Sequence, residues 1–326
     1  MATKNILITG IGGNVGQGIM RNIKSLPYDI KIVGSNVSDF SAGNYLCDVF
    51  YKVPYAFHEN YISSVIDIVT KERIDLIIPS TDFEVYYLTP NKDLIPCGIA
   101  ASGVDAAGIY LDKYQTWLHH QKHNIPFAES FEPSMYQNKF KEYIVKPKKG
   151  RGSKGVYINP PDLTNYSNGE YMVQELHHGE EITTAFYVTR QKKLNGFITM
   201  SRILANGATY MCKVTTRYNA LIQPILEQMI KHASIAGSAN LQSIATEDGR
   251  VIPFEVNCRI SGTNAIRSNF GFKDVQYTLQ EFLYNQQPDI PEIIPGVAVR
   301  GLLDVIYPNQ SDYEALKDNS VKHYIF

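Results

Sequence analysis

The chain has 326 residues, of which 44% are hydrophobic and 19% charged, and its formal net charge is −1. This length allows two or three domains, and the composition is ordinary for a globular protein that buries its core without disulfides. The balance of 31 basic and 32 acidic residues gives no support for a broad nucleic-acid or membrane-surface role. The four cysteines are scattered, and no apolar run approaches the roughly 20 residues of a membrane helix, so we expect a cytoplasmic protein without nucleic-acid or membrane partners.

The first hundred residues alternate strand-like and helix-like segments. Helices are predicted over residues 16–25 and 61–74, where apolar side chains recur at helical spacing. Apolar strands are predicted over residues 5–9, 30–36, 75–80 and 98–102. Strands that alternate with helices in this way predict a parallel sheet with helices on both faces.

Strands outnumber helices in the rest of the chain. Helices are expected over residues 112–123, 220–237 and 274–285. Strands are expected over residues 142–147, 156–158, 170–176, 180–189, 196–200, 209–216, 240–246, 251–257 and 297–308. The EDG sequence between 240–246 and 251–257 predicts that these two strands form a hairpin.

A glycine-rich stretch, ITGIGGNVGQGI, follows the first strand. Gly10, Gly13 and Gly16 satisfy GxxGxxG, but strict GxGxxG fails because Val15 stands where its third glycine belongs. The backbone amides of the following helix favour an anion. An NAD(P)-dependent oxidoreductase or epimerase is therefore one hypothesis. The alternative is a tight strand-to-helix turn, since no tyrosine stands four residues before a lysine in a fitting helix.

A second glycine loop is found in IVKPKKGRGSKGV, residues 144–156. A strand delivers Lys146 at its end, and Gly150, Gly152 and Gly155 are then interleaved with basic residues and a serine. Glycine lets the backbone approach a polyphosphate closely, although the loop lacks the Walker pattern. An exposed basic hairpin is the alternative, but it does not explain so many cations on a glycine loop that leaves a buried strand.

Oxygen-bearing side chains follow on three later strands. Gln174 and Glu175 end an apolar strand, where acceptors can bind the adenine amino group and the ribose hydroxyls of a nucleotide. Gln242 and Glu255 can face the same side of adjacent antiparallel strands, and Asn257 shares the face of Glu255. Three such oxygen donors suit Mg²⁺ carried in with nucleotide phosphates. Arg259, next on that face, can neutralise a transferred phosphoryl group.

Taken in order, these segments resemble the ATP-grasp superfamily and, within it, the carbamoyl-phosphate-synthetase-like carboxylate–amine ligases. The matching sequences are DK at Asp112–Lys113, VKPKKGRGSKGV, VQELHHGEEIT, SR at Ser201–Arg202, CKVT around Lys213 and FEVNCRISGTNA. The resemblance implies an α/β protein whose parallel-sheet, Rossmann-like pre-ATP-grasp domain (1–108) precedes an α+β ATP-grasp fold of two subdomains. These would be a lid with the glycine-rich flap (109–176) and a large C-terminal subdomain (177–326).

The resemblance also implies residue roles. ATP phosphates would contact Lys113, Lys146 and the flap residues Arg151, Gly152, Ser153 and Gly155. Adenine and ribose would contact Gln174, Glu175, Leu176 and Glu181. Mg²⁺, as two ions, would be held by Gln242, Glu255 and Asn257, although Gln242 stands at a usually acidic position and Cys258 replaces a usual proline. Arg202, Lys213 and Arg259 would face the γ-phosphate or the acyl phosphate.

The activity implied is an ADP-forming ligation, in which a substrate carboxylate becomes an acyl phosphate and is then attacked by an amine or ammonia. Candidate substrate contacts are Gly12, Gly13 and Asn14, the strand-end residues Thr81, Asp82 and Glu84, and Arg267. A carboxylate or carbamate kinase and a non-catalytic nucleotide-binding module are alternatives. The resemblance also implies a homodimer, which is common in such ligases.

Overall fold

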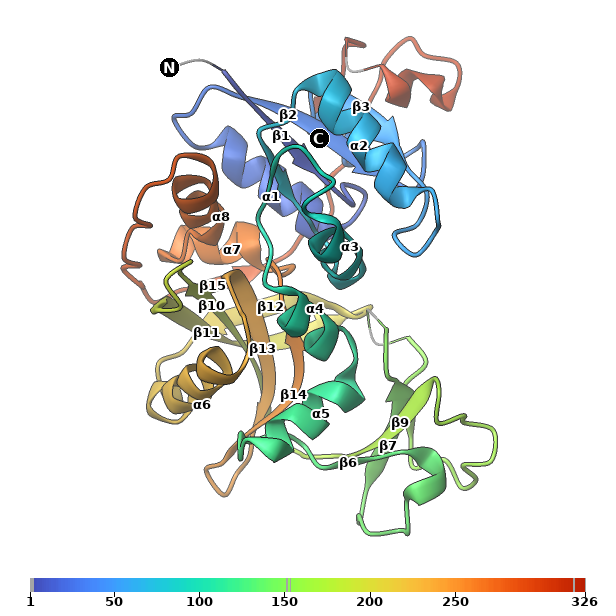
Figure 1. The fold of residues 1–326 in the computed structure, drawn as a ribbon, viewed down its shortest axis with the longest axis vertical. Coiled ribbons are helices and arrows are strands. Elements are labelled where there is room, and N and C mark those ends of the chain that lie inside the picture. The colour runs from blue at the N-terminus through green and yellow to red at the C-terminus, as the bar shows by residue number, and fades with distance from the viewer. Residues whose placement is uncertain (1–2, 151, 153, 319, 326) are drawn as a thin grey trace.

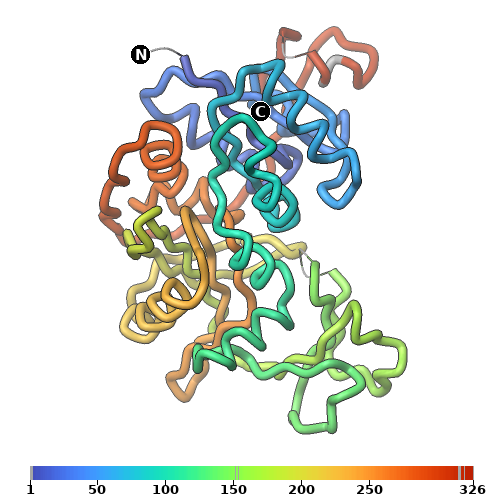
Figure 2. The backbone as a smooth tube through the Cα atoms, in the orientation of Figure 1, coloured from blue at the N-terminus to red at the C-terminus, as the bar shows by residue number. Residues whose placement is uncertain are grey.

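A computed structural model describes residues 3–150, 152, 154–318 and 320–325. Three sheets dominate the structure, with the parallel sheet at the top of Figure 1 and two antiparallel sheets below it. The same orientation as a tube, in Figure 2, shows that the C-terminal segment returns to the side of the N-terminal sheet. No helix in the described part of the chain is long and apolar enough to cross a membrane.

The N-terminal sheet is parallel throughout, in the order β3-β2-β1-β4-β5. Its strands are β1 (Lys4–Ile8), β2 (Ile30–Asn36), β3 (Val49–Lys52), β4 (Leu76–Ile78) and β5 (Gly98–Ile99). Its helices are α1 (Asn14–Lys24), α2 (Tyr61–Glu72), α3 (Asp82–Leu88) and α4 (Val104–Leu111). The strand order reverses between β1 and β4, and ligands of open α/β sheets bind in the crevice at the carboxyl ends of the strands at such a point.

Alternation along β1 assigns its side chains to two cores. Ile6 and Ile8 pack with Ile19 of α1, whereas Leu7 packs with Val65 and Val69 of α2. All are buried from solvent. Because consecutive residues of a strand point to opposite faces, one helix layer covers each side of the sheet, as the sequence predicts.

The central sheet is antiparallel, in the order β14-β13-β10-β11-β12-β15. Its strands are β10 (Glu180–Val188), β11 (Leu194–Ala205), β12 (Ala208–Val214), β13 (Gly237–Ala245), β14 (Val251–Asn257) and β15 (Val297–Val299). Helix α6 (Asn219–His232) covers one face, where Ile222 and Leu226 pack on Ile182 and Phe186. The predicted hairpin of β13 and β14 is confirmed.

The smaller sheet lies at the lower right of Figure 1, in the order β6-β9-β7-β8. It comprises β6 (Ser130–Phe131), β7 (Tyr143–Pro147), β8 (Tyr157–Ile158) and β9 (Tyr171–Glu175), and it follows α5 (Lys113–Lys122). Tyr136, Val145 and Val173 form a core of its own. The glycine-rich loop connects β7 to β8 at the side that faces the central sheet.

The C-terminal helices contribute to the N-terminal core. They are α7 (Asn264–Arg267) and α8 (Asp274–Thr278), which continues as a π-helical turn over Leu279–Leu283. Val275 and Leu279 pack with Ile19 and Ile23 of α1. The remaining elements are β16 (Val305–Ile306), β17 (Tyr324–Ile325) and 3-10 turns at Asn44–Leu46, Thr89–Asn91, Pro133–Met135, Ser268–Phe270 and Tyr313–Lys317.

Several predicted elements have other bounds in the structure, and the following three illustrate why. The strand expected over 297–308 pairs with β12 only from Val297 to Val299, although β12 extends three residues past Met211, the partner of Val299, to Ala208 after the Asn206–Gly207 turn. The helix expected to reach residue 237 stops at His232, where the Ser234 amide donates to Asp105. The helix expected over 274–285 is α-helical only to Thr278.

Candidate functional site

A cavity of about 950 Å³ lies between the carboxyl ends of the parallel strands and the open face of the central sheet. From the N-terminal side it is lined by the predicted candidates Gly12, Gly13, Asn14, Thr81, Asp82 and Glu84. From the central sheet it is lined by Arg202, Gln242, Glu255, Asn257 and Arg259. The fold therefore brings together residues separated by up to about two hundred and fifty positions, at the place where an open parallel sheet binds ligands.

The first glycine loop forms the tight strand-to-helix turn. Gly10 has φ +57°, and a Cβ on it would lie 2.3 Å from Ser80 Oγ, so a larger residue cannot stand there. The Gly13 amide donates to the Gly10 carbonyl at 3.1 Å. The α1 N-terminus has no acidic residue in its first turn and no side-chain cap, and it opens on the cavity.

The loop after β4 is held by a capping box. The Thr81 side chain accepts from the Glu84 amide at 3.2 Å, and Glu84 Oε2 accepts from the Ser80 and Thr81 amides at 3.3 and 3.0 Å. Glu84 is buried, and burial raises the pKa of its carboxyl group. Thr81 and Glu84, two predicted substrate contacts, thus form hydrogen bonds within the turn. Asp82, the third, takes no part in the capping box and lines the cavity.

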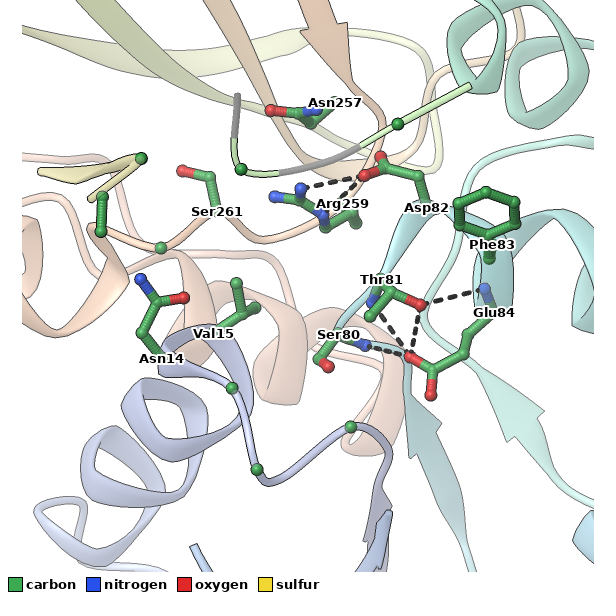
Figure 3. Close-up of a pocket in the computed structure, with 18 of the residues that line it drawn as sticks. Asn14, Val15, Ser80, Thr81, Asp82, Phe83, Glu84, Asn257, Arg259 and Ser261 are labelled. Carbon is green, nitrogen blue, oxygen red and sulfur yellow. Dashed lines mark hydrogen bonds and ion pairs between the residues drawn. The ribbon is translucent and has the colours of Figure 1, made fainter. Parts of the chain in front are cut away.

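Asp82 and Arg259 form an ion pair across the cavity (Figure 3). Asp82 Oδ2 accepts from Arg259 Nε at 3.1 Å and lies 2.9 Å from Nη2, and the side chains are 21% and 15% exposed. Arg259 Nη1 donates to the Ile260 carbonyl at 3.1 Å. This pair joins the first turn of α3 in the parallel domain to the segment that follows β14.

A second cavity of about 240 Å³ adjoins the first. Its apolar walls are Ile144, Pro147, Val156, Leu204 and Phe254. Its polar lining includes Lys113, Lys146, Glu181, Arg202, Gln242 and Glu255, and several of these residues line both cavities. Apolar walls beside lysines are a lining that suits the base and the phosphates of a nucleotide.

Lys146 is a buried cation in the smaller cavity. Its Nζ donates to Gln174 Oε1 at 2.7 Å and to the Phe254 carbonyl at 3.2 Å. Burial and the positive charge of Lys113 lower its pKa to about 7. Gln174, a predicted adenine contact, is thus a partner of Lys146, and Ser130 Oγ accepts from its amide nitrogen at 3.2 Å.

Lys113 stands at the start of α5, where the Asp112 side chain caps the helix. Its Nζ donates to the Gly150 carbonyl of the glycine loop at 3.2 Å and lies 3.9 Å from Glu255 Oε1. Burial raises the pKa of the Glu255 carboxyl, but the positive charges of Lys113 and Lys146 outweigh it and leave the pKa lowered. Glu255 is therefore held as a carboxylate between two lysines.

The predicted metal residues are adjacent. Gln242 pairs with Glu255 in the register of β13 and β14, and Asn257 follows on the same face. Gln242 Nε2 donates to Asn257 Oδ1 at 3.1 Å, and Asn257 Nδ2 donates to Glu255 Oε1 at 3.1 Å. The described residues contain no group of three His, Cys, Asp or Glu that could hold a metal by themselves. One carboxylate and two amide oxygens nevertheless fit Mg²⁺ whose other ligands are phosphate oxygens and water.

Arg202 and Lys213, predicted to act together, lie on opposite faces of the central sheet. Arg202 donates to Glu181 Oε1 at 2.6 Å and to Gln242 Oε1 at 2.5 Å. Lys213 is exposed and pairs with Ser201 in the register, so its side chain projects to the other face. The structure brings Arg202 and Glu181 into the smaller cavity but does not bring Lys213 there.

The glycine loop lies against the β11–β12 turn. Gly152 lines both cavities with φ +65°, and its carbonyl oxygen lies 2.5 Å from where a Cβ on Gly207 would stand. Gly155 has φ +71° but lines neither cavity as the described residues define them. Arg151 and Ser153, also predicted to contact phosphates, lie outside the described residues.

The backbone amides of the predicted adenine contacts at the end of β9 form hydrogen bonds within the protein. The Glu175 amide donates to the Glu129 carbonyl at 2.9 Å, and the Leu176 amide donates to the Glu142 carbonyl at 3.1 Å. Neither residue lines the two cavities of the described chain. The resemblance placed adenine here, and the structure gives these amides protein partners.

The prediction that Arg267 holds a substrate carboxylate is contradicted. Arg267 is fully buried and ion-paired with Asp274, which is also fully buried. Its Nη1 donates to Ser261 Oγ at 2.7 Å and to Thr263 Oγ1 at 2.9 Å. An arginine that is fully buried and directs four of its five N–H donors to protein partners does not face substrate, and Arg267 instead fixes a loop that lines the cavity.

The sequence analysis missed several cavity residues, among them Arg300 and Tyr110. Arg300 donates to the Gly262 carbonyl at 2.7 Å and directly follows β15. The sequence analysis placed Arg300 inside a strand over 297–308 and therefore did not expect it at the cavity. Tyr110 is 2% exposed, and its hydroxyl has no hydrogen-bond partner among the described residues. Tyr110 belongs to α4, which was not expected, so nothing placed it near the site.

Two family models match the sequence. The ATP-grasp domain model matches residues 111–263, and the PylC-like N-terminal domain model matches residues 6–99. No curated protein matches the chain by sequence.

Solved structures share the fold at low identity. The N5-carboxyaminoimidazole synthetase of Staphylococcus aureus complexed with ADP has a TM-score of 0.75 and 15% identity, covering 92% of this chain and 82% of that chain. The biotin carboxylase domain dimer of Hydrogenobacter thermophilus 2-oxoglutarate carboxylase, with MgADP, ADP and bicarbonate, has 0.68 and 14%, covering 88% and 72%. The L-amino acid ligase of Bacillus licheniformis has 0.68 and 13%, covering 86% and 74%. The two family matches confirm the predicted resemblance to the ATP-grasp superfamily: a PylC-like N-terminal domain precedes an ATP-grasp domain.

Proposed function

We propose that the protein is an ADP-forming, Mg²⁺-dependent ligase that joins a carboxylate to an amine or ammonia. The observation that carries the proposal is the pair of adjoining cavities. The smaller has apolar walls and lysines, the larger lies beside it, and Glu255 lines both. The neighbours complexed with ADP or MgADP support nucleotide binding at this fold. The comparisons give no support for an NAD(P)-dependent oxidoreductase.

The smaller cavity would hold ATP. Its apolar walls would enclose the adenine, and Glu181, at the same cavity, would accept from the ribose hydroxyls. Lys146, Lys113 and the glycine loop would contact the phosphates, whose charge is the complement of this group of cations. Gln242, Glu255 and Asn257 would hold Mg²⁺, which neutralises phosphate charge when it is bound with the nucleotide.

The larger cavity would hold the substrates. The carboxylate oxygen attacks the γ-phosphorus of ATP, the bond between that phosphorus and the β–γ bridging oxygen breaks, and ADP leaves. The amine, after losing its extra proton, then attacks the acyl carbon with its nitrogen lone pair, the bond from that carbon to the phosphate oxygen breaks, and phosphate leaves together with the second proton of the nitrogen. Arg202 and Arg259 would stabilise the charge on the transferred group, and the protein would act by positioning and electrostatics, without a covalent intermediate on a side chain.

Substrate-dependent ADP release tests the proposal. The purified protein with MgATP is screened against amino acids, other carboxylates and amines in pairs, and ADP is measured by a coupled assay. We expect release with a productive pair and its loss in Glu255→Gln, because this variant removes the carboxylate nearest both lysines. Glu247→Gln, exposed in the turn of the same hairpin, is the matched control and should retain activity. Full turnover in folded Glu255→Gln would refute the assignment.

A further inference from the structure

The Asp82–Arg259 ion pair has a consequence for catalysis that the proposed function leaves open. Asp82 belongs to the parallel domain and Arg259 to the ATP-grasp domain, and both line the larger cavity. Two guanidinium nitrogens of Arg259 contact one oxygen of Asp82, and the third donates to the Ile260 carbonyl. Arg259, one of the two arginines assigned to the transferred phosphoryl group, is therefore already paired with a carboxylate.

The other oxygen of Asp82 lacks a partner. Asp82 Oδ1 is buried, and no hydrogen bond reaches it from the described residues, although its side chain lines the cavity. A buried carboxylate oxygen without a donor costs free energy, and such a group in a native structure calls for an explanation, such as a ligand. Figure 3 shows Asp82 beside Arg259 and above the capped turn of Thr81 and Glu84, which fixes its position.

A cationic donor would suit this carboxylate oxygen. An ammonium group carries three donors on a compact charge, so it satisfies a carboxylate oxygen at a confined position. Its positive charge also competes with the guanidinium for the same carboxylate. An amine that docks on Oδ1 would therefore weaken the hold of Asp82 on Arg259.

We propose that Asp82 is the receptor for the ammonium group of the amine substrate, and that this docking releases Arg259 to the γ-phosphate. This inference rests on the proposed ligase function and names its amine as one bound in the charged form. The pair then acts as a gate. Without the amine, Arg259 stays paired with Asp82, and hydrolysis of ATP is suppressed. In that reaction water attacks the γ-phosphorus, the bond to the β–γ bridging oxygen breaks, and ADP, phosphate and a proton are released.

Basal hydrolysis of MgATP, with water as the only acceptor, tests the gate. Asp82→Asn keeps the size of the side chain but removes its charge, so Arg259 is no longer neutralised. We expect ADP release without added substrate to rise by about fivefold, because losing an ion pair of this kind frees at most about 1 kcal/mol of interaction for the phosphate. The rise should vanish in Asp82→Asn/Arg259→Ala, because it depends on the freed guanidinium. Asp67→Asn, an exposed acid on α2, is the control and should match the wild type.

Methylammonium chloride serves as the probe for ammonium docking, and tetramethylammonium chloride at the same concentration lacks the N–H donors. We expect methylammonium to raise ADP release by the wild type, tetramethylammonium not to do so, and Asp82→Asn to respond to neither. The inference is overturned if Asp82→Asn releases ADP no faster than the wild type, or if both proteins respond equally to methylammonium. Failure of the proposed function is distinguishable, because neither the wild type nor Asp82→Asn would then release ADP in response to any carboxylate and amine pair.

Discussion

At the scale of single residues, the most unusual group is Lys146. It is 4% exposed, and burial together with the neighbouring Lys113 lowers its pKa to about 7. A lysine with such a pKa changes its charge near neutrality, whereas an ordinary lysine stays protonated there. Its partners Gln174 and Phe254 offer only neutral oxygens, so a nucleotide phosphate would be the strongest stabiliser of its charged form.

This lysine predicts how nucleotide affinity depends on pH. Below about pH 7 Lys146 is already protonated when ADP binds. Above about pH 7 it is mostly neutral, so ADP binding requires the lysine to take up a proton, which costs more free energy as the pH rises. We therefore expect the Kd for MgADP to rise from pH 7 to pH 9, approaching about tenfold per pH unit. Isothermal titration calorimetry from pH 6 to 9 measures this slope.

Lys146→Met provides the control, because the ionisation of the nucleotide itself is the same for both proteins. The variant should bind MgADP more weakly at pH 6 and should lack the part of the slope that belongs to the lysine. An identical slope in both proteins would show that Lys146 does not carry the pH dependence.

Sequence reasoning found the site residues whose neighbours are close along the chain. Glu255 and Asn257 share a face by strand alternation, and a short hairpin brings Gln242 opposite Glu255. It failed for Lys213 and Arg267, because the strand register and an ion pair, rather than distance along the chain, set their environments. The register with β11 sends Lys213 to the other face, and Asp274 removes Arg267 from the cavity by pairing with it.

At the scale of elements, long periodic segments were predictable and short ones were not. Helix α2 and strands β10 and β14 fill more than two turns or several alternations, and they appear near their predicted bounds. Helix α3 was missed because its seven residues carry little periodicity, although Thr81 and Glu84 form a capping box that could have indicated its start. The Asn206–Gly207 pair is a hairpin signal that could have placed the tight turn between β11 and β12.

The contact between the glycine loop and this turn yields an element-scale prediction. Gly207 has φ +72°, and an added Cβ would lie 2.5 Å from the Gly152 carbonyl oxygen. Gly207→Ala should displace the loop and weaken MgADP binding by about tenfold, which corresponds to ~1.4 kcal/mol. Titration calorimetry at pH 7 measures the change.

Gly249→Ala separates loop displacement from backbone strain. Gly249 also has a positive φ, +85°, but an added Cβ would meet nothing within 4 Å. It should therefore lose a similar amount of stability and keep wild-type affinity for MgADP. Equal affinities for the two variants would mean that the loop does not depend on Gly207.

At the scale of the whole molecule, the chain closes on itself. The C-terminal helix α8 and the turn after it supply Val275 and Leu279 to the core that contains Ile19 and Ile23 of α1. Ile260, in the segment after β14, joins the same core. The larger cavity lies between parts that this core holds together, so its geometry depends on contacts between the two ends of the sequence.

The shared core predicts that the two sheets unfold together. Leu279 is fully buried, so Leu279→Ala should lower the free energy of unfolding by about 2–5 kcal/mol. The single tryptophan, Trp117, lies on α5 outside this core and packs beside Phe131 of the small sheet, so its fluorescence reports on a distant region. In urea, the midpoints from tryptophan fluorescence and from far-ultraviolet circular dichroism should coincide and should shift together in the variant.

Leu221→Ala is the control: Leu221 is half-exposed on α6, so this variant should change stability by no more than about 0.5 kcal/mol. A tryptophan midpoint unmoved by Leu279→Ala would instead show that the N-terminal sheet and its C-terminal helices unfold as a separate unit, and that the cavity joins two independently stable parts.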